Sequence, residues 1–117
     1  MLKDERVNHT SYLINAEIDL SELENDVTEI ADLKVGSEIL QVSVEVTKAG
    51  AGTIDLGISD KNDFFLNDID LATADESYIS KVITTLKDNV SLVLDTTSRD
   101  GVIKVRVLYF TESKMIK

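Results

Sequence analysis

Apolar and polar residues alternate along most of this sequence, and this period of two constrains the fold more than any other feature. In an extended chain successive side chains point to opposite sides, so alternation marks a strand with one buried and one exposed face. The most regular run places Leu40, Val42, Val44 and Val46 between polar residues. The same period predicts four more strands, with apolar positions at Tyr12, Ile14, Ala16, Ile18 and Leu20, at Ile54, Leu56 and Ile58, at Val90, Leu92 and Leu94, and at Ile103, Val105, Val107 and Tyr109.

Short glycine-containing segments separate these runs and predict two hairpins. Residues 48–53, which include two glycines, follow the most regular run, and residues 98–101, which end in Asp100-Gly101, lie between the last two runs. An Asp-Gly pair supplies the positive φ that tight hairpin turns need. We therefore expect one hairpin through residues 48–53 and a second hairpin that closes the chain.

Two segments fit more than one secondary structure. Residues 21–24 match a helix capping box and are flanked by apolar residues at helical spacing, although residues 27–30 also suit a strand. We expect a short helical turn near residues 21–25. Residues 78–86 also show helical spacing, but their many β-branched side chains favour a strand. With both segments counted, about seven short strands predict an all-β fold, an antiparallel β-sandwich or jelly-roll-like barrel with at most one short helical turn.

The length and composition fit one compact domain. The chain has 117 residues, 43% of them hydrophobic, and no cysteine, so its core must be stable without disulfides. Residues 9–117 are expected to form a single β-sandwich domain after a flexible N-terminal arm, residues 1–8. No apolar run approaches the roughly 18 residues of a membrane-spanning helix, and the N-terminus lacks the apolar segment of a secretory signal. We expect the protein to stay in the cytoplasm where it is made, unless it is assembled into a particle.

The net charge of -10 argues against partners such as nucleic acid or anionic membranes. The charge is also uneven, because residues 1–76 carry 18 acidic and 5 basic side chains whereas residues 77–117 carry 4 and 7. The two parts attract each other, either within one chain or between copies. The stretch from Glu17 to Asp32 has seven acids and no base, which is typical of a solvated face or, alternatively, of a docking surface for a basic partner.

The sequence carries few residues suited to catalysis. His9 is the only histidine, and it lies in a polar stretch with no visible partner to orient it. The motifs G-x-S-x-G, G-x-x-x-x-G-K-S/T, G-x-G-x-x-G and H-E-x-x-H do not occur. We therefore expect a protein that is not an enzyme and needs no cofactor.

Residues 60–70 form an acidic segment that is expected to be a loop. Within it Asp60, Asn62 and Asp63 are weak candidates for calcium ligands, because calcium prefers oxygen atoms, but the segment lacks the glycine and the distal glutamate of an EF-hand. The adjacent Phe64 and Phe65 point to opposite sides of an extended chain. One ring is therefore expected in the core and the other is available to a neighbouring molecule.

Aromatic residues bear on a possible carbohydrate site, because sugar rings stack on exposed aromatic platforms. The chain has no tryptophan. Tyr12 and Tyr109 lie on the apolar sides of their strands, where packing in the core is the favoured interpretation.

Five short motifs follow one another in an order that carries the strongest functional signal. They are Leu33-Lys34-Val35-Gly36, the strand over residues 39–47, Gly52-Thr53-Ile54-Asp55-Leu56-Gly57, the segment from Ser59-Asp60 to Phe64-Phe65-Leu66, and the closing strand over residues 100–110. This order resembles the small structural proteins of tailed bacteriophages and prophages over roughly residues 26–110. The resemblance also favours a strand over residues 27–33.

The resemblance implies a virion component, a capsid decoration or cement protein on the outside of the head. Such a protein binds the major capsid protein and also itself, with a trimer favoured, and strengthens the shell through many weak symmetric contacts. The contacts expected on this interpretation involve Phe64, Phe65 and Asp68 of the acidic segment, together with Lys104 and Arg106 pairing with acidic groups of a neighbour. Two alternatives stay open: a tail, neck or fibre-base protein of the virion, and a soluble calcium- or glycan-binding module.

Overall fold

The structure, a computed structural model, describes residues 9–112, and the arm predicted at residues 1–8 lies outside them. Nine strands and one 3-10 turn make up these described residues: β1 (His9–Asp19), η1 (Leu20–Glu22), β2 (Val27–Leu33), β3 (Glu38–Lys48), β4 (Thr53–Ile58), β5 (Lys61–Asp70), β6 (Ser77–Ile79), β7 (Thr84–Thr85), β8 (Val90–Asp95) and β9 (Val102–Glu112).

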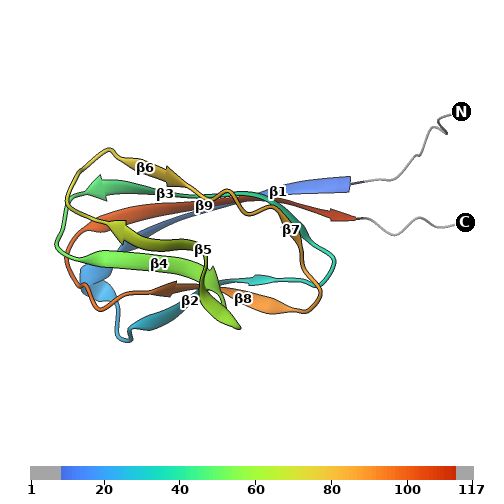
Figure 1. Cartoon of the computed structure of the whole chain (residues 1–117), viewed down its shortest axis with the longest axis horizontal. Coiled ribbons are helices and arrows are strands. Elements are labelled where there is room, and N and C mark those ends of the chain that lie inside the picture. The colour runs from blue at the N-terminus through green and yellow to red at the C-terminus, as the bar shows by residue number, and fades with distance from the viewer. Residues whose placement is uncertain (1–8, 113–117) are drawn as a thin grey trace, which may run out of the picture.

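The strands form two antiparallel sheets that face each other (Figure 1). Sheet A has the order β1-β9-β3-β6, with β7 also paired to β3, and sheet B has the order β2-β8-β4-β5. This order, in which most consecutive strands alternate between the sheets, is that of a jelly roll. The all-β sandwich or jelly-roll prediction is therefore confirmed.

The pairing of the strands shows that the chain is one long antiparallel hairpin rolled into two layers. Its tip is Ser59-Asp60, between the paired residues Ile58 and Lys61. From there the two arms stay paired to the ends of the described chain, through Thr53 with Asp70, Ser43 with Ile79, Glu38 with Thr85, Val27 with Asp95 and His9 with Glu112. Pairing of β3 with β9 and of β4 with β8 then closes the roll sideways.

The core lies between the inner faces of the two sheets, where the predicted alternation holds. Each fully buried aliphatic side chain there contributes roughly 1.5–3 kcal/mol to folding. The completely or almost completely buried side chains include Val42, Val44 and Val46 of β3, Ile54 and Leu56 of β4, Leu92 and Leu94 of β8, and Ile103, Val105 and Val107 of β9.

One predicted core position in β3 is wrong. The register of β3 against β9 shifts between Ile39 and Gln41. This bulge turns Ile39 into the core, where it is completely buried, and leaves Leu40 only half-buried. Alternation alone could not place the bulge, because both neighbours are apolar.

Both predicted hairpins are wrong. The strands β3 and β4, and likewise β8 and β9, belong to different sheets, so residues 49–52 and 96–101 cross from one sheet to the other. Alternation reports which face of a strand is buried, and it is the same whether the next strand lies beside it or opposite it. The glycines serve the crossings: a Cβ on Gly50 would collide with the backbone of Asp100, and Gly101 has φ 108°.

Four other expectations meet different outcomes. The strand over residues 27–33 is confirmed as β2, and the helical turn is η1, which begins at Leu20 and is capped by Asp19 instead of Ser21. The single strand expected over residues 78–86 is instead two very short strands, β6 and β7. The acidic segment 60–70 is wrong as a loop, because it forms strand β5, which pairs with β4 across two register shifts.

Candidate functional site

The basic residues of β9 lie in the middle of sheet A, between two strands that carry acids. Lys104 is paired in register with Glu17 of β1 and with Glu45 of β3. Arg106 donates from Nη1 to Oε1 of Glu45 at 2.9 Å. The attraction between the acidic and basic parts of the chain is therefore satisfied at least in part within one molecule. Both partners of this ion pair are partly exposed, so it contributes less than about 1 kcal/mol, and contact of Lys104 and Arg106 with a neighbour stays a prediction.

The two adjacent phenylalanines of β5 have different surroundings. Phe65 is buried in the core, whereas Phe64 is half-buried. Their rings meet edge to face, with centroids 5.1 Å apart and planes at 67°. Phe64 also lines a surface hollow with Asp60, Thr85 and Lys87. The rings touch, so the prediction that they point to opposite sides of the chain is wrong. Of the two rings, only that of Phe64 is exposed enough for contact with another molecule.

The polar residues of β5 and of the turn before it are spread along the chain. Asp60 is exposed in the turn, Asn62 donates from Nδ2 to Oδ2 of Asp95 at 3.3 Å, and Asp68 has φ 53° with its backbone N–H bonded to Oδ1 of Asp55 at 2.7 Å. Within the described residues no group of three or more His, Cys, Asp or Glu side chains could hold a metal ion. Because Asn62 is not one of these side-chain types, the weak calcium candidates Asp60, Asn62 and Asp63 stay a prediction.

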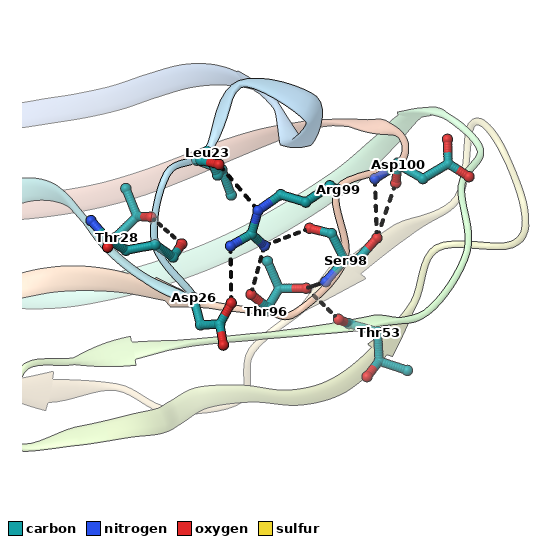
Figure 2. A network of polar contacts seen from close by, with 9 residues as sticks. Leu23, Asp26, Thr28, Thr53, Thr96, Ser98, Arg99 and Asp100 are labelled. Carbon is teal, nitrogen blue, oxygen red and sulfur yellow. Dashed lines mark hydrogen bonds and ion pairs between the residues drawn. The ribbon is translucent and has the colours of Figure 1, made fainter.

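A network around Arg99 joins three connections at one end of the sandwich (Figure 2). The guanidinium donates to the carbonyl oxygen of Leu23 at 3.1 Å and to those of Thr96 and Ser98 at 3.0 and 2.9 Å. Its Nη2 lies 2.9 Å from Oδ1 of Asp26. These bonds tie the segment between η1 and β2 to the crossing between β8 and β9.

Thr96 and Ser98 extend this network to the other crossing. Thr96 is almost completely buried, and its Oγ1 donates to the carbonyl oxygen of Thr53 at 2.7 Å and accepts from the N–H of Ser98 at 3.0 Å. Ser98 Oγ in turn donates to the carbonyl oxygen of Ala51 at 2.6 Å. This anchor was not predicted from the sequence. Its only signal there is a single arginine in the turn at residues 98–101, in a chain that also carries the acidic stretch from Glu17 to Asp32.

Large apolar side chains are exposed along both edges of sheet A. On β1, the ring of Tyr12 is 44% exposed and Leu13 is 61% exposed, and on the opposite edge Ile79 and Ile83 are 58% and 68% exposed. The prediction that Tyr12 packs in the core is wrong. Since β1 is an edge strand, Tyr12 is covered on one side only, by the ring of Tyr109, which stacks on it with centroids 5.2 Å apart.

The 3-10 turn η1 is too short to cross a membrane, and the described residues contain no other helix that could do so. No family model matches the chain, and no curated protein matches it in sequence.

Solved structures that share the fold come from the capsids of three bacteriophages. A chain of the acidic stable capsid structure of Helicobacter pylori bacteriophage KHP30 has a TM-score of 0.73 and 24% identity, over 94% of this chain and 98% of that one. A chain of the cyanophage Pam1 capsid has a TM-score of 0.64 and 16% identity, over 95% and 91% of the two chains. A chain of the capsid of Ralstonia phage GP4 has a TM-score of 0.61 and 13% identity, over 98% and 91%. The fold expected from the phage resemblance is therefore confirmed.

Proposed function

We propose that this protein is a non-enzymatic structural component of a tailed-phage virion, a decoration protein that binds the outside of the head. The observation that carries the proposal is the extent of the likeness to the KHP30 capsid chain, which covers 94% of this chain and 98% of that one. Since almost nothing of either chain is left over, the two are of similar length and consist of the same sandwich.

The proposed partners are the major capsid protein and further copies of this chain, with a trimer favoured. The contact residues predicted from the sequence lie on two separate surfaces, because Lys104 and Arg106 are on β9 of sheet A, whereas Phe64 and Asp68 are on β5 at the edge of sheet B. Two surfaces allow one molecule to contact two neighbours at once. Bridging of this kind adds contacts to the shell, and its strength comes from repetition over many copies.

Location of a labelled copy on intact particles tests this function. The protein, carrying a terminal affinity tag, is produced during growth of the phage or prophage that encodes it, and gold label on purified particles is imaged by negative stain. We expect label on the head. Label on the tail or neck would instead support the alternative of a tail, neck or fibre-base protein, and particles without label would contradict a virion role.

Substitution of Phe64 by alanine tests the contact surface separately. The ring is half-buried and lines a hollow, so its loss is expected to weaken binding to heads at least about tenfold. Val35, which is exposed in the connection between β2 and β3, gives a matched control, and its change to alanine should leave binding unchanged. Equal binding of both variants would remove Phe64 from the contact.

A further inference from the structure

Two apolar patches lie on opposite edges of the same sheet. We name the outward edge of β1 at Tyr12 and Leu13, which lie on opposite faces of the strand, the first edge patch. The second edge patch is Ile79 of β6 with Ile83, which follows β6 and precedes β7. The strand order β1-β9-β3-β6 places them at the two ends of sheet A (Figure 1). Exposed apolar side chains that gather at a sheet edge are candidates for contact with another molecule.

Both patches also border backbone that has a partner on one side only. Within the described residues β1 pairs with β9 alone, along all eleven of its residues, and β6 and β7 pair with β3 alone. The outward edge of such a strand presents N–H and C=O groups that can pair with another strand. The edges of sheet A therefore combine apolar side chains with free strand edges.

The charge distribution indicates which partner fits these edges. None of the 22 acidic residues lies in residues 9–16 or 77–86, and the single charged side chain there is that of Lys81. Two copies of a chain with net charge -10 repel each other where their acids face, and these two segments add no acid to that repulsion. These stretches of the two edges of sheet A therefore allow another copy to approach without adding acids at the contact.

The strip between the patches holds polar residues beside Leu108, which argues against one broad apolar partner over the whole outer face of sheet A. Across the sheet, Leu13 of β1 lies beside Leu108 of β9, which lies beside Gln41 of β3. Two residues further along β9, Arg106 lies beside Ser43 of β3. Arg106 is already bonded to Glu45 of the same molecule. A partner on the whole face would cover this ion pair, whereas contact at the edges leaves it in water.

We propose that the first edge patch of one copy binds the second edge patch of the next, so that sheet A continues from molecule to molecule. This contact joins two different surfaces, and such contacts close into a ring when the rotation between copies allows it. A two-fold contact between two β1 edges would leave Ile79 and Ile83 uncovered. The inference rests on the self-association in the proposed function and assigns the surfaces that carry it.

Paired charge substitutions test the head-to-tail contact directly. Leu13→Asp and Ile83→Asp each place a carboxylate in one patch, at side chains exposed enough for the fold to tolerate the change. Each variant alone is expected to become monomeric in analytical ultracentrifugation, because every contact then contains one altered patch, with association weakened on the order of a hundredfold. An equimolar mixture of the two variants should form a heterodimer, since one copy's intact first patch meets the other's intact second patch.

Val35→Asp is the matched control, because it changes an apolar residue outside both patches that is also more than half exposed, and it should associate as the unaltered protein does. Thermal unfolding confirms that each variant is folded. A monomeric unaltered protein at all concentrations, an Ile83→Asp variant that still associates, or a mixture that stays monomeric would each overturn the proposal. Binding of the monomeric variants to heads is measured separately, so failure of the ring and failure of the decoration role are distinguishable.

Discussion

The two ends of the sandwich differ in how their surfaces are satisfied. At the end that holds η1 and both crossings, Arg99, Thr96 and Ser98 bond the connections to one another, and Leu20 is completely buried. At the opposite end, where the chain enters and leaves, β1 and β9 run side by side and carry exposed Leu13 and Tyr12 (Figure 1). The bonded connections that stabilise the single molecule thus lie at the crossing end, whereas the other end holds part of the edge that we propose to contact a second copy.

The sharpest contrast between the ends is that of two leucines. Leu20→Ala at the crossing end should lower the free energy of unfolding by about 3–4 kcal/mol, because it leaves a cavity at a completely buried position. Leu13→Ala, at a side chain that is mostly exposed, should cost less than about 0.5 kcal/mol. Urea unfolding of dilute protein measures the free energy of unfolding of both variants. Equal losses in the two variants would contradict the difference between the two ends of the sandwich.

The Arg99 network should carry the next largest effect. Arg99→Ala removes the donors to three carbonyl oxygens and the partner of Asp26, so we expect a loss of about 3 kcal/mol in the free energy of unfolding. Arg106→Ala removes one partly exposed ion pair in the middle of sheet A and should cost less than about 1 kcal/mol. If the two variants unfolded at the same urea concentration, Arg99 would not be an anchor.

Loss of the Thr96 hydroxyl should lower the free energy of unfolding by less, again because buried hydrogen bonds at the crossing end are lost. In Thr96→Val the shape is kept, but the carbonyl oxygen of Thr53 and the N–H of Ser98 lose their buried partner, at a cost of about 2 kcal/mol. The neighbouring Thr97 is exposed, and Thr97→Val should change the free energy of unfolding by less than about 0.5 kcal/mol. Thermal unfolding of the pair under one set of conditions tests the difference, and an unchanged melting temperature in Thr96→Val would contradict it.

The smallest effect concerns acid stability at the start of η1. The side-chain hydroxyl of Ser21, and then its backbone N–H, bond to Asp19 and hold the pKa of that carboxyl below its usual value of 3.8. The folded-state pKa is lowered, so this stabilisation is present above about pH 4 and is lost as the pH falls through the folded-state pKa. Ser21→Ala removes the hydroxyl and should make the melting temperature fall slightly less between about pH 5 and pH 2.5. Melting temperatures that fall by the same amount with pH in Ser21→Ala and in the unaltered protein would contradict this role of Ser21.

Local patterns predicted the strands well because a strand with one buried face carries an apolar residue at every second position. The apolar positions of β3, β4, β8 and β9 follow from alternation, and only the bulge near Leu40 displaced one of them. Pairing could not be predicted in the same way. The rolled hairpin with its tip at Ser59-Asp60 brings together residues as far apart as His9 and Glu112, and no local signal specifies such partners.

Candidate contact residues were harder to predict than the fold, because their exposure and their bonding partners depend on which strands lie next to them. Alternation placed Tyr12 in the core, yet it is exposed because β1 lies at a sheet edge, and alternation did not indicate which of Phe64 and Phe65 is buried. Arg106 has an acidic partner on the adjacent strand of its own molecule, which only the pairing of β9 with β3 shows. The edge patches were invisible in the sequence for the same reason.

Cryo-electron microscopy of purified phage particles tests the proposed presence of this protein on the virion most directly. A decoration role predicts density for the jelly roll on the outer surface of the head, with β1 of one copy beside β6 and β7 of the next. A head whose outer surface holds no such density, or the same sandwich found only in the tail, would contradict it.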